Sequence, residues 1–241
     1  MDKEQKWLQR RCGCISASML SDIESKSGKI TLGVQSAIRS KRFERKRGYS
    51  LPVSSREMEI GKEQEKYAVE WFRENHPEIP IIYAQELPEI PFWEVSWAKY
   101  GASPDAFSED ESVVVEFKTL VSNGKIEFFC DEHTPWIAKE LAVWEEHSDQ
   151  ILGQFLSNEK VQTIYLVKYV FQDDYNDFDL DSPTAPWRGF VFRFNREDYP
   201  ESLERLKKRI EFIDALIDSD LNPAEMDDYE LCNGKLVKQE K

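Results

Sequence analysis

The pattern of hydrophobic and polar residues predicts both helices and strands in this chain. Helices are expected where apolar residues recur every three or four positions, at about 56–75, 136–156 and 197–218. Strands are expected in short apolar or β-branched runs bounded by turn residues, at about 79–87, 91–100, 112–118, 161–171 and 188–194. This mixture indicates a central mixed sheet flanked by helices, so the predicted fold class is α/β or α+β.

The N-terminal quarter of the chain is less regular. Residues 7–23 suggest an entry segment followed by the start of a helix, which Ser16 or Ser18 could cap. Periodicity is weak over residues 24–55, and no element is predicted there. We expect one domain over residues 1–241.

The helix at about 56–75 places a charge on an otherwise small or apolar face. Gly61, Glu65, Ala68 and Phe72 fall at offsets of 0, 4, 7 and 11 residues, which align along one side of a helix. An unpaired carboxylate on a buried face is costly. Either Glu65 is exposed, or a positive group meets it.

The strand at 112–118 also carries charge. Side chains alternate between the two faces of a sheet, so Glu116 and Lys118 lie on one face and Val115 and Phe117 on the other. The valine run draws this segment into the core. Glu116 and Lys118 are therefore expected to be partners or functional residues.

Asp105 precedes Glu116 by eleven positions, across a short polar turn that allows a hairpin. Two carboxylates ~4 Å apart would repel by about 4 kcal/mol at an effective dielectric constant of 20. A divalent cation would remove this repulsion, and carboxylate oxygens suit Mg²⁺ or Mn²⁺. The alternative is a buried ion pair between Lys118 and Asp105 or Glu116, without chemistry.

The charge composition limits the kinds of partner that the protein can bind. The formal charge of −14 opposes non-specific coating of nucleic acid, although residues 39–47, which include Arg42 and Arg45, hold six basic residues against one acidic residue. This run is either a solvated helix face or a phosphate-binding patch.

Cellular location follows from what the sequence lacks. No apolar stretch approaches the ~20 residues that cross a membrane, and the N-terminus lacks the apolar region of a secretory signal. Four scattered cysteines and three isolated histidines suggest neither a disulfide scaffold nor structural zinc. We expect a cytoplasmic protein without a membrane partner.

Five short motifs, in order, resemble the phage-type exonucleases related to bacteriophage lambda exonuclease, the YqaJ-like viral recombinases, within the PD-(D/E)xK nuclease superfamily. These motifs are Trp7 followed by Arg11-x-Gly13-x-Ile15-Ser16-Ala17-Ser18, then Gly61-x-x-x-Glu65-x-x-Ala68, then Gly101-x-Ser103-Pro104-Asp105-Ala106, then Glu116-Phe117-Lys118, and finally Gln150. They span about residues 7–156. A motif-bearing core is expected over about 7–195.

The resemblance implies a restriction-endonuclease-like core and a Mg²⁺-dependent deoxyribonuclease, for which Mn²⁺ can substitute. It implies 5′-to-3′ degradation of double-stranded DNA ends in phage-type recombination, a single-strand annealing protein as partner, and a trimer. A bacterial host cell and a phage or prophage origin fit this family. The implied site residues comprise metal ligands Asp105, Glu116, Glu65 and the Phe117 carbonyl, the catalytic residues Lys118 and Gln150, and the 5′-phosphate ligands Arg11, Ser18 and Ser103.

Some positions depart from the family pattern. Ala106 replaces the commoner glycine, and Thr119-Leu120 stands in place of Cys-Pro. Two other functions stay open. One is a restriction-like or RecB-like endonuclease, whose iron–sulfur versions need a C-terminal cysteine cluster where only Cys232 occurs. The other is a non-catalytic nuclease-fold module that binds proteins and needs no metal.

Overall fold

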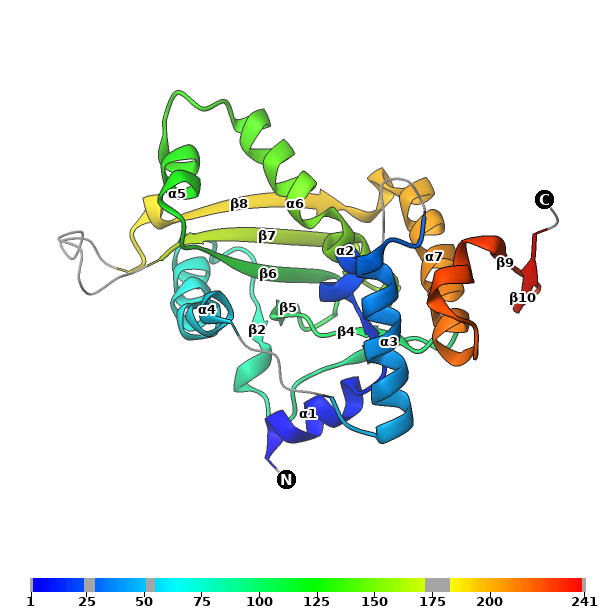
Figure 1. The fold of residues 1–241 in the computed structure, drawn as a ribbon. Helices are drawn as coiled ribbons and strands as arrows, with labels where there is room; N and C mark the ends of the chain where they lie inside the picture. The colour runs from blue at the N-terminus through cyan, green and yellow to red at the C-terminus, as the bar shows by residue number, and fades with distance from the viewer. Residues whose placement is uncertain (1, 24–28, 51–54, 172–182, 240–241) are drawn as a thin grey trace.

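The central feature of the molecule is a five-stranded mixed sheet (Figure 1). A computed structural model describes residues 2–23, 29–50, 55–171 and 183–239. In spatial order the strands are β2 (Ile82–Tyr83), β5 (Ala106–Phe107), β6 (Val113–Leu120), β7 (Thr163–Val170) and β8 (Gly189–Asn195). β6 and β7 pair in parallel, and the other neighbours pair antiparallel.

Helices cover both faces of this sheet. The helix α4 (Arg56–Asn75) packs on one face through Ala68 and Phe72, which meet Val115 and Phe117 of β6. The opposite face meets α6 (Trp136–Ser157), and α7 (Pro200–Asp218) packs against α6. Alternation along β6 therefore divides its side chains between two apolar clusters, as the sequence pattern predicted.

The N-terminal elements form a smaller layer beside the sheet. They are α1 (Lys3–Arg11), β1 (Ile15–Ser16), the 3₁₀ turn η1 (Ala17–Met19), α2 (Leu20–Ile23) and α3 (Leu32–Arg47). β1 joins a second sheet of order β1-β4-β3, with β3 (Trp93–Glu94) and β4 (Tyr100–Ala102). Because β4 is followed at once by β5, the segment 103–105 links the two sheets.

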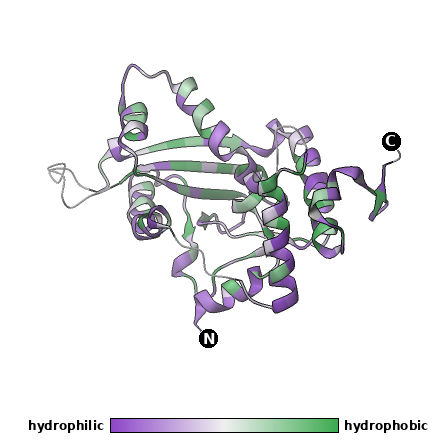
Figure 2. Ribbon diagram, viewed as in Figure 1, coloured by the Kyte–Doolittle hydropathy of each residue, from purple (hydrophilic) through white to green (hydrophobic). Residues whose placement is uncertain are grey.

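The remaining elements complete the chain. They are the helix α5 (Asn123–Cys130), the 3₁₀ turns η2 (Ala84–Glu86), η3 (Pro186–Arg188), η4 (Arg196–Asp198) and η5 (Pro223–Asp228), and the hairpin of β9 (Tyr229–Cys232) and β10 (Lys235–Lys238). Hydrophobic residues are concentrated on the central strands and the helix surfaces that cover them, while α1 is largely hydrophilic (Figure 2). No helix in the described parts of the chain is long and apolar enough to cross a membrane.

The long elements match their predictions closely. α4, α6 and α7 begin and end within a few residues of the expected bounds, and all five predicted strand regions contain strands. α1 and α5 were not predicted, and α3 lies in the region left open. The prediction that Ser16 caps a helix was wrong, because it precedes η1 without a cap hydrogen bond, and Ser18 lies within η1. The single domain stays a prediction. Residues 171–186, an acidic segment between β7 and β8, lie mostly outside the described residues.

Candidate nuclease site

Asp105 and Glu116 are brought together by the predicted hairpin. Ala106 pairs with Val115 and Phe107 with Val114, so the next pair along the ladder places Asp105 opposite Glu116. Residues opposite each other in an antiparallel pair share a face. The Phe117 backbone N–H donates to Asp105 Oδ2 at 2.9 Å, which fixes the carboxylate against β6.

Glu116 is held by two glutamines of α6. Its side chain is 1% exposed, and it accepts hydrogen bonds from Gln150 Nε2 at 2.6 Å and from Gln154 Nε2. These glutamines lie one turn apart and present their amides to the same carboxylate. The prediction that Gln150 joins the site is supported by this contact. Gln154 was visible in the sequence one turn later but was not included among the expected site residues.

Glu65 reaches the same group from α4. Its Oε1 accepts a hydrogen bond from the Tyr83 hydroxyl at 2.9 Å. Sequence reasoning did not find Tyr83, because a tyrosine in a short apolar run carries no sign of a polar role. Glu65 is partly buried and not a free surface acid, which resolves the first alternative posed by its helix face.

The three carboxylates destabilise one another's charged forms. Burial raises the pKa of Glu65 to about 8, and repulsion from Asp105 adds to the effect. Burial also raises the pKa of Glu116 well above its ordinary value, with further contributions from Asp105 and Glu65. The pKa of Asp105 is raised by burial, against the lowering effects of Lys118 and the Phe117 N–H. These acids would ionise more readily with a cation between them.

Lys118 supplies one positive charge to this group. Its Nζ lies 3.7 Å from Glu116 Oε2, and its side chain is 29% exposed. The ammonium therefore borders both the buried acids and solvent. It partly offsets the negative charge of three carboxylates.

The group fits a divalent cation by the kind of donor that it offers. The described residues contain no set of three His, Cys, Asp or Glu side chains already arranged around one metal position. Carboxylate oxygens are nevertheless the donors that Mg²⁺ and Mn²⁺ prefer. Gln154 Oε1, within the same group, is a buried oxygen without a hydrogen-bond partner. An unsatisfied acceptor among mutually repelling acids favours a bound cation or its water.

A second cluster contains Arg11, Ser16 and Ser18. Arg11 Nη2 donates to Ser16 Oγ at 3.3 Å and to Ser18 Oγ at 3.4 Å, and the two hydroxyl oxygens are 3.2 Å apart. Burial lowers the pKa of the Arg11 guanidinium, while Glu44 opposes that change. A desolvated cation beside two hydroxyls offers several donors to an anion.

Trp7 joins this cluster to Ser103. The Trp7 ring lies under the Arg11 guanidinium, 4.3 Å from its centre, and Trp7 Nε1 donates to Ser103 Oγ at 2.7 Å. The Ser103 carbonyl in turn accepts from Gln154 Nε2 at 3.2 Å. The structure thus connects the expected phosphate ligands to the glutamine that holds Glu116. Ser16 was expected only as a motif residue or a helix cap, and its contact with Arg11 was not predicted.

Gly153 explains how α6 comes so close to the segment before Asp105. A Cβ at this position would lie 2.5 Å from Leu20 Cδ1 and 2.7 Å from the Tyr100 hydroxyl. The Tyr100 hydroxyl donates to the Gly153 carbonyl at 2.6 Å. This close approach places Gln154 beside Ser103.

The structure places Arg42 and Arg45 away from these clusters. Arg42 donates to carbonyls at the end of α7, including Leu216 O at 2.6 Å and Leu221 O at 2.8 Å. Arg45 Nε donates to Gly13 O at 2.9 Å, and its Nη1 lies 2.7 Å from Asp218 Oδ1. These contacts join α3 to α7 and to the Gly13 loop, so the basic run is neither a fully solvated face nor a free phosphate patch at these two positions.

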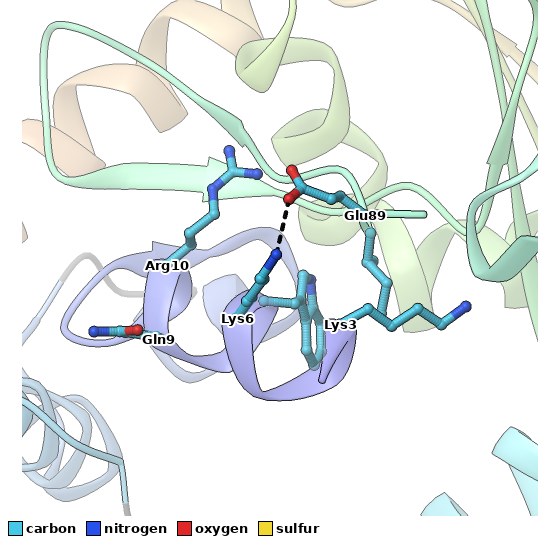
Figure 3. A pocket seen from close by; sticks show the side chains of 7 residues that line it. Lys3, Lys6, Gln9, Arg10 and Glu89 are labelled. Carbon is cyan, nitrogen blue, oxygen red and sulfur yellow. Dashed lines mark hydrogen bonds and ion pairs between the residues drawn. The ribbon is translucent and has the colours of Figure 1, made fainter. Parts of the chain in front are cut away.

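A pocket of about 370 Å³ lies between α1 and residues 89–90 (Figure 3). Lys3, Lys6 and Arg10 line it, but each already has a partner. Lys6 Nζ is 3.3 Å from Glu89 Oε1, Arg10 donates to the Phe92 carbonyl at 2.7 Å, and Lys3 donates to a backbone carbonyl. We assign this pocket no ligand.

Solved structures with a similar fold are exonucleases. The chain matches the crystal structure of an alkaline exonuclease (LHK-Exo) from Laribacter hongkongensis with a TM-score of 0.63 at 18% identity, over 92% of this chain and 94% of that chain. LHK-Exo in complex with dAMP gives a TM-score of 0.62 at 19% identity over the same shares. The chain has the fold of these exonucleases.

A second exonuclease of this fold extends the comparison beyond one protein. A phage related exonuclease from Haemophilus somnus 129PT matches with a TM-score of 0.61 at 18% identity, over 85% of this chain and 93% of that chain. No protein-family model and no curated protein matches the sequence. The expected resemblance to phage-type exonucleases is confirmed as a resemblance of fold.

Proposed function

We propose that the protein is a Mg²⁺-dependent exodeoxyribonuclease that degrades one strand of duplex DNA from its 5′ end. The observation that carries this proposal is the direct link between the acid cluster (Asp105, Glu116 and Glu65) and the phosphate cluster (Arg11, Ser16, Ser18 and Ser103, joined through Trp7). Gln154 contacts both Glu116 and the Ser103 carbonyl. The exonuclease fold of the three structural neighbours supports the same activity.

The acid cluster would hold the metal through Asp105, Glu116 and Glu65. The Phe117 carbonyl is a further proposed ligand. When bound, Mg²⁺ would neutralise charge that builds up on the scissile phosphate. Mn²⁺ should substitute, because it accepts the same oxygen donors.

The protein's own groups account for the rest of the reaction. Lys118 borders solvent beside Glu116, so its ammonium can hold an attacking water and donate hydrogen bonds to phosphate oxygens. Gln150 and Gln154 fix the Glu116 carboxylate and prevent it from turning away. Arg11, Ser16 and Ser18 would hold the terminal 5′-phosphate, which carries more charge than an internal phosphate.

The partner protein and the oligomeric state in this proposal are based only on the resemblance to the family. A single-strand annealing protein would use the strand that remains, and the exonuclease would act as a homotrimer in the cytoplasm of a bacterial host. Light scattering of the purified protein would measure the assembly directly.

Cleavage of three duplexes tests the proposed activity. The substrates are a linear duplex with 5′-phosphates, the same duplex with 5′-hydroxyls, and a closed circle, each with Mg²⁺ or with EDTA. We expect rapid release of mononucleotides from the first, slower release from the second, and none from the circle or in EDTA. Efficient cutting of the circle would favour an endonuclease, and no cutting at all would favour a binding module.

Lys118 variants provide the matched control for this assay. Arginine keeps the charge of lysine but is planar and bulkier, so it would hold the water in a different place, and Lys118→Arg should not restore the activity lost in Lys118→Ala. Wild-type rates in Lys118→Ala would reduce Lys118 to an ion-pair partner of Glu116.

A further inference from the structure

A third group of charged side chains lies beyond Lys118 on the same face of the sheet. β6 and β7 run in parallel with Lys118 in register with Lys168. Their side chains therefore stand next to each other across neighbouring strands, ~5 Å apart in backbone position. Lys168 is only 2% exposed, an unusual burial for a lysine.

The contacts of Lys168 extend this group to α6 and α5. Lys168 Nζ lies 2.5 Å from His147 Nε2 and 3.1 Å from Glu146 Oε2. Lys125 Nζ of α5 lies 2.7 Å from Glu146 Oε1. We call Lys118, Lys125, Lys168, His147 and Glu146 the basic cluster. With His147 neutral, Lys125 and Lys168 share the single carboxylate of Glu146, while Lys118 also lies 3.7 Å from Glu116.

Burial and the neighbouring lysines act in the same direction on the pKa values of His147 and Lys168, and Glu146 opposes both shifts. Burial lowers the pKa of His147 to about 3, and Lys168 and Lys118 lower it further. Burial also lowers the pKa of Lys168 to about 8, with Glu146 opposing the change and Lys125 and Lys118 adding to it. On a chain with a formal charge of −14, Lys118, Lys125 and Lys168 form a local concentration of basic side chains.

The three clusters follow one another along α6. Gln154, Gln150 and His147 lie at helical spacing on one side of the helix. Gln154 contacts the Ser103 carbonyl next to the phosphate cluster, Gln150 contacts Glu116, and His147 contacts Lys168. A DNA strand whose 5′-phosphate lies in the first cluster and whose scissile bond lies in the second would carry its next phosphates toward the third.

We propose that the basic cluster binds a backbone phosphate on the 3′ side of the scissile bond, a subsite that rests on the proposed function. Lys125 and Lys118 have side chains that are 53% and 29% exposed, so both can reach a phosphate from the surface. Lys168 lies beneath them and adds positive charge without direct contact. Glu146 holds Lys125 and Lys168 in place.

Binding measurements test the subsite without any need for cleavage. A labelled 5′-phosphorylated duplex is titrated in EDTA with wild type, Lys125→Ala and Lys208→Ala, with fluorescence anisotropy as the readout. Lys208 is a matched control, because it is an exposed lysine paired with Glu204 at 3.2 Å on α7, at the opposite end of the molecule from α5 (Figure 1). We expect Lys125→Ala to raise Kd about threefold to fivefold, the range for one exposed ion pair, and Lys208→Ala to leave it unchanged.

Neutral methylphosphonate linkages locate the contact. One such linkage is moved along the 5′-ended strand, and each duplex is titrated with wild type, Lys125→Ala and Arg11→Ala. One internal methylphosphonate should weaken wild-type binding but not that of Lys125→Ala, because the partner charge is already gone. That linkage should lie farther from the 5′ end than the first bond hydrolysed in Mg²⁺. In Arg11→Ala, by contrast, the effect of each internal methylphosphonate should remain, and only the loss of affinity caused by removing the terminal 5′-phosphate should disappear.

The outcomes separate this proposal from the proposed function. Equal Kd values for Lys125→Ala and Lys208→Ala would overturn the subsite. It would also be overturned if the linkage whose effect disappears in Lys125→Ala lies on the 5′ side of the first bond cut. If the expected binding pattern appears but wild type hydrolyses nothing with Mg²⁺, the internal phosphate contact is supported and the proposed hydrolysis is overturned.

Discussion

Asp105 of the acid cluster and Ser103 of the phosphate cluster flank Pro104, but the two clusters differ in how well their charged and polar groups are satisfied. In the acid cluster, burial raises the pKa values of Glu65, Asp105 and Glu116, and repulsion from Asp105 raises those of the two glutamates further. In the phosphate cluster, Arg11 is already bonded to two serine hydroxyls and stacked on Trp7. The first cluster is unfavourable in its charged state, whereas the second satisfies its own polar groups.

This difference indicates what a ligand does at each place. A cation would relieve repulsion in the acid cluster, so metal binding should stabilise the fold. A phosphate would replace internal hydrogen bonds that already exist in the phosphate cluster, so it should change substrate choice more than stability. Removing charge from the two clusters should therefore affect activity and stability in different proportions.

Asp105→Asn should give the largest effect, because it removes a charge from the acid cluster. We expect nuclease activity to fall by at least about a thousandfold, since a metal supplies several kcal/mol of charge stabilisation. The metal-free variant should unfold at a higher temperature than wild type near pH 8, because repulsion is relieved. Initial rates on 5′-phosphorylated duplex and thermal melts in EDTA measure both effects.

Asparagine is chosen for this test for a reason found only in the structure. Asp105 Oδ2 accepts the Phe117 N–H, so alanine would leave a backbone donor without its partner and hide the gain in stability. Asn retains an oxygen acceptor. Full activity of repurified Asp105→Asn would exclude Asp105 as a metal ligand.

Arg11→Ala should give the next largest effect, on substrate choice alone. Wild type is expected to prefer 5′-phosphorylated over 5′-hydroxyl ends by about tenfold or more, because a hydrogen bond to a charged group contributes roughly 1.5 to 3 kcal/mol. The variant should lose that preference while retaining its rate on 5′-hydroxyl ends. Equal rates on both ends in wild type would show that the phosphate cluster does not select the terminus.

The sequence predicted the acid cluster better than the phosphate cluster. Asp105, Glu116 and Lys118 are close in sequence, and period-two alternation in one hairpin was enough to place them on one face. Arg11, Ser18 and Ser103 were named from the family motifs, but nothing local showed how they meet. Their connection depends on Trp7 reaching across 96 positions to Ser103.

Other residues escaped prediction because their roles depend on tertiary contacts. Tyr83 lies in an apolar run and gains its polar partner only when α4 packs beside β2. Arg42 and Arg45 looked like DNA-binding residues because they lie in a basic run, yet they contact carbonyls and acids in and just after α7, more than 160 positions away, and Arg45 also contacts the Gly13 carbonyl. A charge run in sequence carries no information about such distant acceptors.

A smaller effect is expected in the pH dependence of stability, to which the acid cluster contributes through Glu65. The pKa of Glu65 is raised to about 8, above its ordinary value, so the folded state binds more protons than the unfolded state between those two values. The contribution of Glu65 to the free energy of unfolding of metal-free protein should therefore decrease as pH rises through this window, whereas that of His147 should increase up to its ordinary pKa of 6.5. Adding Mg²⁺ should raise Tm by about 5 °C at pH 8, which is roughly 2 kcal/mol for a chain of this size, and by much less at pH 5.

Glu65→Gln is the control for this measurement. It removes the titrating group, so the decrease in Tm between pH 5 and pH 8 should become smaller in EDTA. Arg11→Ala, which changes only the other cluster, should follow the wild-type profile. A Tm that does not respond to Mg²⁺ at pH 8 would contradict metal binding by these acids.

Trp7→Phe should give the smallest effect and tests whether the two clusters act together. Phenylalanine retains a ring beneath Arg11 but lacks the N–H that donates to Ser103 Oγ at 2.7 Å. Loss of one neutral hydrogen bond is worth about 1 kcal/mol, so the preference for 5′-phosphorylated ends should fall by about threefold to fivefold. The rate on 5′-hydroxyl ends should stay the same if Trp7 acts only through the phosphate cluster. An equal loss on both kinds of end would instead show that Trp7 also positions Ser103 and Asp105 for the chemical step, and the two clusters would then have to be treated as one site.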